Sequence, residues 1–273
     1  MDLLGSAILT NLVALGPSPN AHAAFSRSAV VTDSPRYSVV IPAFNEEANV
    51  EPLTHEIAVV MEGLSEPYEI VWVDDGSRDT TPDRVRTLEA DGVGSHGTVR
   101  LIQVGRQSGQ TSAMDLGMRA AAGAVVITID ADRQNDPTDI PKLVAGLATH
   151  DVAVGWRQNR QDTWVKRYTS RFANWLRITV TQDPIHDTGC SLKAFRREVL
   201  ADIKLFHGMH RFLSTLAKME GYTVVEVPVA HRARVAGVSK YTTLNRMIGP
   251  LLDLFAVRWM QSRSLYRRRH GSR

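Results

Sequence analysis

From residue 37 to residue 155 the chain alternates short β-branched runs with segments of helical periodicity. The first run, YSVVI, is expected to stop at Pro42. Such runs predict buried strands, and the helical segments between them predict βαβ units around a mainly parallel sheet. The sequence therefore predicts an α/β fold. The expected strands are 37–41, 68–73, 99–104, 124–129 and 151–155, and the expected helices are 49–64, 82–90, 110–123 and 138–148.

Polar clusters follow the predicted strands at their carboxyl ends. AFNEE follows the first strand, DDGSRD follows the second, DADRQ follows the fourth, and Arg157 follows the fifth. Because the carboxyl ends of parallel strands share one edge, where open α/β sheets bind ligands, the four clusters predict a single site.

After residue 156 the pattern changes. A basic amphipathic helix is expected over 164–178 and a strand over 222–229. The apolar stretch 247–260 is interrupted by a proline and two charged residues, so it is too short to span a bilayer and suits an interface. We expect a disordered extension at 1–36, a main α/β domain at 37–240 and a basic, amphipathic membrane-interface segment at 241–273.

The net charge of +3 conceals an asymmetry. Residues 1–150 contain 10 Lys/Arg and 20 Asp/Glu, whereas residues 151–273 contain 22 and 9. A basic second half indicates an anionic partner, and uneven surface composition is the plainer alternative. The single cysteine, Cys190, excludes an intrachain disulfide and fits a reducing compartment.

Asp130 and Asp132 leave the fourth predicted strand two residues apart, and Gln134 follows them. In an extended segment residues i and i+2 point the same way, so the two carboxylates would repel each other unless a cation lies between them. Hard oxygen ligands suit Mg²⁺ or Mn²⁺, which usually complete their shells with substrate phosphates and water. The alternative is that these acids cap a helix beginning near Asp136. Their position at the carboxyl edge favours the metal.

Asp74 and Asp75 end the second predicted strand. A carboxylate there can accept a hydrogen bond from a nucleotide base or a ribose hydroxyl, and an Asx turn is the alternative for one of the two. GVGSHG at 92–97 fits a dinucleotide-binding pattern by its letters, but it follows a helix and precedes a strand. That order disfavours a Rossmann oxidoreductase.

The motifs VVIPAFNEEANV, VWVDDGSRDTT, QSGQTSAMDLG and IDADRQNDP, in this order and spacing, resemble those of the family 2 glycosyltransferases of GT-A fold. HDTGCSLKAFRREV and HRARVAGVSKY narrow the resemblance to the dolichyl-phosphate mannose synthase-like branch, which includes bacterial enzymes that load a sugar onto undecaprenyl phosphate. The resemblance covers residues 37–260. It implies a Rossmann-like, mainly parallel sheet flanked by helices, with C-terminal amphipathic interface helices.

The resemblance also implies roles for individual residues. The D-x-D-x-Q element would hold a metal ion and the donor diphosphate, through Asp130, Asp132 and Gln134. The nucleotide sugar would be held by residues at the first two strand ends: Pro42, Ala43, Asn45, Glu47, Asp74 and Asp75. The acceptor phosphate would meet an R-x-x-G-x-S-K element formed by Arg234, Gly237, Ser239 and Lys240.

The acceptor decides whether the reaction needs a base. A sugar hydroxyl requires a carboxylate general base, whereas a phosphate monoester, with a second pKa of about 6, is largely a dianion at neutral pH and needs cations. Asp187 is the acid whose role stays open. It is a base if the acceptor is a hydroxyl, or else the partner of an arginine, a lysine or a donor hydroxyl. The second half supplies the cations Arg157, Lys166, Arg211, Arg232, Arg234 and Lys240.

These observations predict an inverting, metal-dependent glycosyltransferase that moves a sugar from a UDP- or GDP-sugar to a polyprenyl phosphate. The expected catalytic residues are Asp132, Asp187 and Arg234. Residues 258–273 contain six arginines and no acid, so we expect peripheral binding to the cytoplasmic face of a membrane, with no spanning helix and no nucleic-acid partner. Transfer to a sugar hydroxyl of a glycan and non-catalytic binding of a nucleotide sugar are the alternatives.

Overall fold

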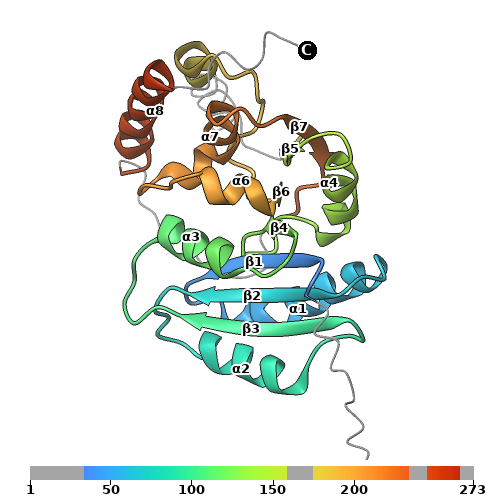
Figure 1. Cartoon of the computed structure of the whole chain (residues 1–273). Coiled ribbons are helices and arrows are strands. Elements are labelled where there is room, and N and C mark those ends of the chain that lie inside the picture. The colour runs from blue at the N-terminus through green and yellow to red at the C-terminus, as the bar shows by residue number, and fades with distance from the viewer. Residues whose placement is uncertain (1–33, 159–174, 234–244, 265–273) are drawn as a thin grey trace, which may run out of the picture. The chain divides into compact units, whose positions relative to one another are not determined.

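The computed structural model describes residues 34–158, 175–233 and 245–264, and seven strands within these ranges form one sheet (Figure 1). The strands are β1 (Tyr37–Ala43), β2 (Tyr68–Asp74), β3 (Gly97–Gln103), β4 (Val125–Thr128), β5 (Val152–Arg157), β6 (Lys193–Arg196) and β7 (Val224–Val229). Six of them correspond to predicted strands, whereas β6 was not predicted. The expected extension at 1–36 and the expected helix at 164–178 lie mostly outside the described residues.

The strand order is β3-β2-β1-β4-β6-β5-β7. β6 runs antiparallel to β4 and to β5, and all other neighbouring pairs are parallel, which confirms the predicted α/β fold with a mainly parallel sheet. The order of the chain reverses between β1 and β4. Ligands of open α/β sheets bind beyond the carboxyl ends of the strands at such a switch point. Because β6 is antiparallel, its first residue, Lys193, lies at this same edge.

Helices cover both faces of the sheet. Successive residues of a strand point to opposite faces, so each strand can contribute side chains to two cores. Val39 and Ile41 of β1 pack into a core with α1, α2 and α4, whereas Val40 packs into a second core with α3, α6, α7 and α8. The helices are α1 (Glu47–Glu62), α2 (Thr81–Asp91), α3 (Gln110–Ala120), α4 (Ile140–Gly146), α6 (Arg197–Asp202), α7 (Leu213–Met219) and α8 (Asn245–Arg263), with the 3₁₀ turns η1 (Pro137–Asp139) and η2 (Met209–Phe212).

The first strand continues through Pro42, so the predicted stop at that residue is wrong. The carbonyl of Val40 accepts a hydrogen bond from the amide of Ile129 on the β4 side, and Pro42 lies two residues further along that side. β4 pairs with β1 only as far as Thr128 opposite Val40. The missing N–H of Pro42 therefore costs no ladder hydrogen bond. β1 projects beyond β4 at the switch point, as far as Ala43.

Helix α8 has one face in the core and another that is exposed. Leu254 and Val257 are buried. Leu252, Phe255 and Trp259 are 65%, 56% and 63% exposed. No helix in the described part of the chain is long and apolar enough to cross a membrane. The predicted division of the chain into 37–240 and 241–273 stays a prediction.

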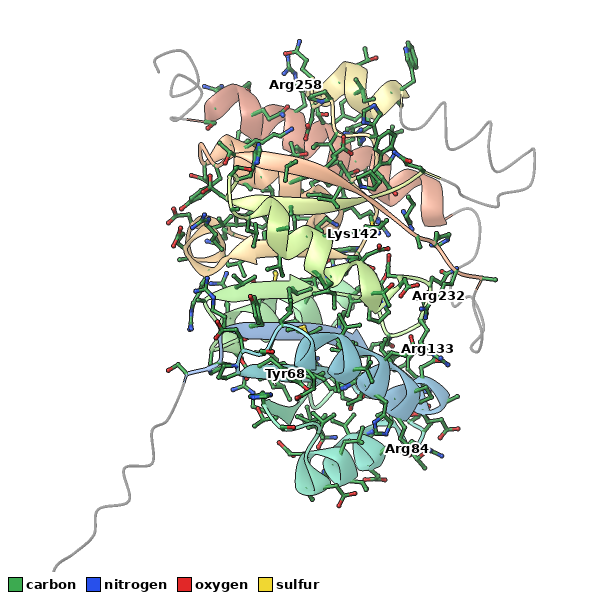
Figure 2. All side chains as sticks on the ribbon, turned by 90° about the vertical axis from the view of Figure 1, so that its right-hand side faces the viewer. Tyr68, Arg84, Arg133, Lys142, Arg232 and Arg258 are labelled. Carbon is green, nitrogen blue, oxygen red and sulfur yellow. The ribbon has the colours of Figure 1, made fainter. Side chains whose placement is uncertain are left out.

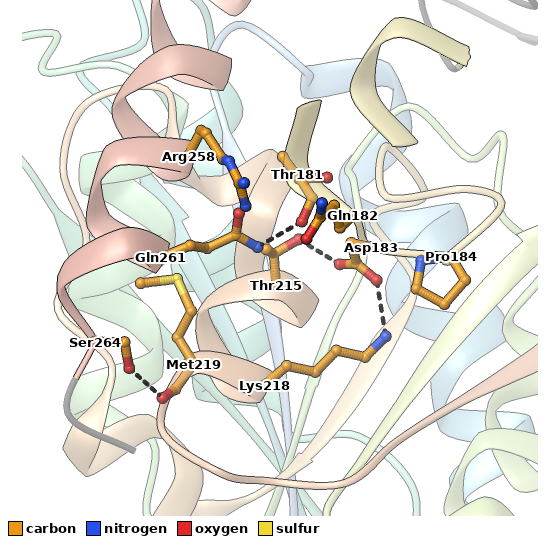
Figure 3. A pocket seen from close by; sticks show the side chains of 10 residues that line it. All are labelled: Thr181, Gln182, Asp183, Pro184, Thr215, Lys218, Met219, Arg258, Gln261 and Ser264. Atoms are coloured by element: carbon orange, nitrogen blue, oxygen red, sulfur yellow. Dashed lines mark hydrogen bonds and ion pairs between the residues drawn. The ribbon is translucent and has the colours of Figure 1, made fainter. Parts of the chain in front are cut away.

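An ion pair between a buried carboxylate and a partly exposed lysine joins the segment after the helical residues 175–181 to α7. Lys218 Nζ lies 2.8 Å from the carboxylate of Asp183, which also accepts the Thr215 hydroxyl at 2.6 Å (Figure 3). Burial of Asp183 favours its protonated form. The hydrogen bonds from Lys218 and Thr215 nevertheless hold the pKa of Asp183 below its usual value.

Replacing Asp183 with asparagine should destabilise the protein by about 2 kcal/mol at pH 7, because the partly exposed Lys218 loses a charged hydrogen-bond partner. In the wild type this carboxylate contributes stability above its unfolded pKa of about 3.9, and the contribution is lost as the pH falls through the lower native pKa. The difference between wild type and variant should therefore shrink below about pH 4. Urea unfolding at pH 7 and pH 3 measures both effects, and an equal difference at the two pH values would contradict this account.

Candidate active site

The segment after β4 turns instead of continuing as a strand. Arg133 has a φ of 58°, in the left-handed region, and Asp132 Oδ1 accepts the amide of Gln134 at 3.2 Å. The expectation that Asp130 and Asp132 lie on an extended segment is therefore wrong. The two carboxylates are nevertheless neighbours. Burial raises the pKa of Asp130, and the charge of Asp132 raises it further.

Asp130 lies among polar groups from several elements. Gln110 Nε2, at the start of α3, donates to Asp130 Oδ1 at 2.9 Å. Hydrogen bonding by the Ser191 hydroxyl opposes the rise in the pKa of Asp130. The Ser191 hydroxyl accepts a hydrogen bond from Asn135 Nδ2 at 2.7 Å. Two close carboxylates in a recessed position repel each other, and a bound cation would relieve that repulsion.

Lys193 places a positive charge beside these acids, and the sequence analysis did not identify it as a site residue. The residue is 2% exposed, and its ammonium donates to the carbonyl of Cys190. Burial lowers the pKa of Lys193, and the nearby carboxylates of Asp187 and Asp130 oppose that shift. The available signal was a lysine set among apolar residues in SLKAF, where a solvated lysine would not be expected.

Asp187 is held by Arg157 in a two-point ion pair. Arg157 Nε and Nη2 lie 2.7 and 2.9 Å from the two carboxylate oxygens. The two side chains are only 14% and 11% exposed. Because both oxygens already accept from the guanidinium, the geometry favours the arginine-partner alternative for Asp187 over the role of a base.

The loop that carries this aspartate is fixed to β5 and β7. Glu226 on β7 accepts the amide of His186 at 2.7 Å, and the His186 ring stacks on Trp156 with centroids 4.5 Å apart. At Gly155 the loop crosses β5 so closely that a Cβ would lie 2.8 Å from Cys190 Sγ. Burial raises the pKa of the Cys190 thiol, which indicates a packing residue and not a nucleophile.

The DDGS carboxylates accept hydrogen bonds from loop amides. Asp75 accepts the amides of Ser108 and Gly109 at 2.7 and 2.8 Å and the Ser108 hydroxyl at 2.7 Å. Asp74 Oδ1 accepts the Ser77 amide at 3.1 Å, which is the turn that was the alternative reading for one of the pair. Gly109 is followed by Gln110, which donates to Asp130 after β4. The loop before α3 therefore connects the end of β2 to the end of β4.

The loops after β1 and β2 are interlocked. The amide of Asn45 donates to Ser77 Oγ at 2.8 Å, and its side-chain oxygen accepts the amide of Arg78 at 2.7 Å. Glu47 Oε2 accepts the amide and the hydroxyl of Thr80 at 3.0 and 2.5 Å. The predicted nucleotide-binding residues thus shape two loops at the switch point, beside the projecting end of β1.

The remaining predicted acceptor cations are spread more widely. Arg232 follows β7 and lies 2.7 Å from both Glu56 and Asp136. Arg211 lies on η2 beside His210, and burial, followed by the charge of Arg211, lowers the pKa of that imidazole to about 3. The predicted residues outside the described ranges, whose roles stay predictions, are Lys166, Arg234, Gly237, Ser239 and Lys240.

The donors after β4 fit a hard divalent cation. Asp130 and Asp132 supply carboxylate oxygens, and Gln134 can supply an amide oxygen. These are fewer ligands than Mg²⁺ or Mn²⁺ takes, so the remainder would come from diphosphate and water. In the described ranges no three acidic, histidine or cysteine side chains gather into a cage.

The sheet order and its flanking helices are those of a GT-A glycosyltransferase fold, as predicted. Glucosyl-3-phosphoglycerate synthase of Mycobacterium tuberculosis, solved with Mg²⁺ and UDP, has a similar fold, with a TM-score of 0.61 at 20% identity. The alignment covers 83% of this chain and 79% of that one. The structure of the same enzyme with Mn²⁺ and UDP-glucose gives the same values.

The family model described as glycosyl transferase family 2 matches residues 38–204, and the chain belongs to this family. It is 39% identical over 226 residues to the dodecaprenyl-phosphate galacturonate synthase of Rhizobium johnstonii. It is 37% identical over 220 residues to the undecaprenyl-phosphate 4-deoxy-4-formamido-L-arabinose transferase of Sodalis glossinidius. The predicted resemblance to the polyprenyl-phosphate branch is confirmed. The alignments cover 81% and 80% of this chain but 65% and 66% of those relatives, so the chain spans about two thirds of their length.

Replacing Asp75 with alanine should destabilise the protein by about 2 kcal/mol, because the donors at Ser108 and Gly109 lose a charged, buried acceptor. Amide hydrogen exchange should accelerate at these two residues. Asp115→Ala is the matched control, since it removes an exposed ion pair with Arg119 worth about 0.5 kcal/mol. Equal losses for the two variants in urea unfolding would contradict a structural role for Asp75.

Proposed function

We propose that this protein transfers a sugar from a nucleotide diphosphate sugar to a polyprenyl phosphate at a membrane surface. The observation that carries the proposal is the meeting of two carboxylates, Asp130 and Asp132, with the buried Lys193 and the largely buried Arg157 at one edge of the sheet. Two relatives support the acceptor, because one is named a dodecaprenyl-phosphate galacturonate synthase and the other an undecaprenyl-phosphate transferase.

The donor is assigned to the carboxylate pair and the loops of the switch point. Asp130 and Asp132, with Gln134, would hold Mg²⁺ or Mn²⁺ against the diphosphate. The interlocked loops after β1 and β2 would receive the nucleoside. UDP together with Mg²⁺ in a protein of the same fold supports this arrangement.

The acceptor is assigned to the cations beside that pair. A phosphate monoester has a second pKa of about 6, so it is largely a dianion at neutral pH and needs no base to activate it. Arg157 is fixed in place by Asp187, which we interpret as a positioning residue for the guanidinium. Lys193 adds positive charge close to the same acids. This charge pattern favours a phosphate acceptor over a sugar hydroxyl.

The reaction is a single displacement that inverts the anomeric carbon. A phosphate oxygen of the acceptor forms a bond to that carbon while the bond to the donor diphosphate breaks, and the electron pair leaves with the nucleoside diphosphate. A divalent ion supplies Lewis acidity to the leaving diphosphate when bound. Arg157 and Lys193 offset the charge where two anionic groups approach each other.

A detergent assay with radiolabelled UDP- and GDP-sugars and undecaprenyl phosphate tests the proposal. We expect a lipid-extractable product that disappears with EDTA. Asp132→Asn should lower the transfer rate at least about 100-fold, because it removes part of several kcal/mol of leaving-group stabilisation and each 1.36 kcal/mol is tenfold. Asp115→Asn, which alters an exposed pair, is the control.

The outcomes of this assay separate the alternatives. A water-soluble glycan product would favour transfer to a sugar hydroxyl. Nucleotide-sugar binding without metal dependence and without turnover would favour a non-catalytic binding protein.

The exposed face of α8 supports peripheral attachment to a membrane surface. Its apolar residues follow the spacing i, i+1, i+4 and i+8, which puts them on one side of the helix. They are Leu251, Leu252, Phe255 and Trp259, each at least 41% exposed. Arg258 and Arg263 belong to the same helix, and three arginines follow at 267–269. Apolar side chains combined with arginines suit the interface of an anionic leaflet.

Replacing Leu252, Phe255 and Trp259 together with serine should weaken binding to anionic phospholipid vesicles at least about 100-fold, because each large side chain contributes roughly 1.5 kcal/mol or more when buried. Vesicle co-sedimentation measures the effect. Val59→Ser is the matched control, since Val59 is 76% exposed on α1. Unchanged binding by the triple variant would exclude this face as the membrane contact.

A further inference from the structure

One carboxylate on α1 holds two arginines that come from different loops. Glu56 Oε1 accepts hydrogen bonds from Arg133 Nε at 3.1 Å and from Arg133 Nη2. Glu56 Oε2 accepts from Arg232 Nη1 at 2.7 Å. Figure 2 shows Arg133 and Arg232 close together on the same side of the molecule. Both oxygens of Glu56 are therefore engaged, and its side chain is 27% exposed.

Arg133 stands between Asp132 and Gln134, two of the residues assigned to the metal. Its φ of 58° costs a residue with a Cβ roughly 1–2 kcal/mol. Such a conformation persists only where the surrounding structure holds it. The contact between the Arg133 side chain and Glu56 supplies that restraint.

Arg232 binds Asp136, the last residue of the same turn. Its Nε lies 3.0 Å from Asp136 Oδ2 and its Nη2 lies 2.7 Å from Asp136 Oδ1. Its backbone amide donates to the carbonyl of Gln134 at 2.8 Å. The turn 132–136 is thus held at two points by arginines that share Glu56.

We propose that Glu56 is the positioning residue of the turn that holds the metal and the donor diphosphate. The inference rests on the proposed function. Glu56 and Asp136 balance the charges of Arg133 and Arg232, so the intact group adds no net charge beside the cation. Loss of the Glu56 charge would free the turn and leave a positive charge uncompensated near the metal. Both effects weaken cation binding.

The test is a titration of the full chain with Mn²⁺ in the presence of UDP, with free Mn²⁺ followed by electron paramagnetic resonance. Glu56→Gln should raise the Kd for Mn²⁺ about tenfold, the lower end of the effect of residues that orient metal ligands. UDP binding without metal should stay unchanged. The Mn²⁺ concentration that gives half-maximal transfer should rise by the same factor. Glu51→Gln is the matched control, because Glu51 pairs with Arg84 elsewhere on α1.

A second variant, Arg133→Gln, keeps the test decisive if Glu56→Gln folds poorly. Arg133→Gln frees the turn but also removes a positive charge near the cation, so its Kd for Mn²⁺ should rise by less than that of Glu56→Gln. The double variant restores the charge balance and should bind Mn²⁺ more tightly than Glu56→Gln does. A normal Kd in Glu56→Gln, or in Arg133→Gln if Glu56→Gln does not fold, would overturn the inference and leave the proposed function intact. Failure of the wild type to bind Mn²⁺ with UDP would instead remove the proposed function, and the inference with it.

Discussion

The carboxylate of Asp130 is the charge around which the switch-point edge is organised. It is recessed, so it must be compensated by donors and cations from the protein or by a ligand. Gln110 reaches it from the start of α3, Ser191 from the loop before β6, and the charge of Lys193 from β6 itself. These contacts tie the first half of the chain to the second. A protein of this fold cannot shift one of these elements without changing the surroundings of that acid.

Much of the fold could be predicted from the sequence because each βα unit carries its own periodic signal. The sequence of the short strand β6 shows no such periodic signal. Its four residues, KAFR, are too few for a pattern, and its position depends on antiparallel pairing with β4 and β5, which are distant in the chain. Lys193 was missed as a site residue for the same reason, since only this pairing brings its ammonium to the edge where the parallel strands end. The turn at Arg133 was also missed, because its backbone conformation is held by a residue on α1.

The kinds of residue in the candidate site were predictable, but their partners were not. Strand-end carboxylates are visible in the sequence, whereas the donors they accept come from loops that only the fold brings near. Asp75 is engaged by the loop before α3, and Asp187 by the last residue of β5. Several carboxylates of the acidic first half therefore accept hydrogen bonds from the loops of that same half. The basic second half brings Arg157 and Lys193 to the same edge, which gives the charge asymmetry of the sequence a structural meaning.

Gly155 limits which residues can occupy the middle of β5. Even a methyl group at that position would lie 2.8 Å from Cys190 Sγ and 2.9 Å from the carbonyl of Leu192. The displaced segment, residues 188–192, joins Asp187 to Lys193. Replacing Gly155 with alanine, in the middle of β5 and away from the proposed ligands, would therefore misalign Asp187 and Lys193 together. The placement of Asp187 and Lys193 is therefore constrained at a position that has no side chain.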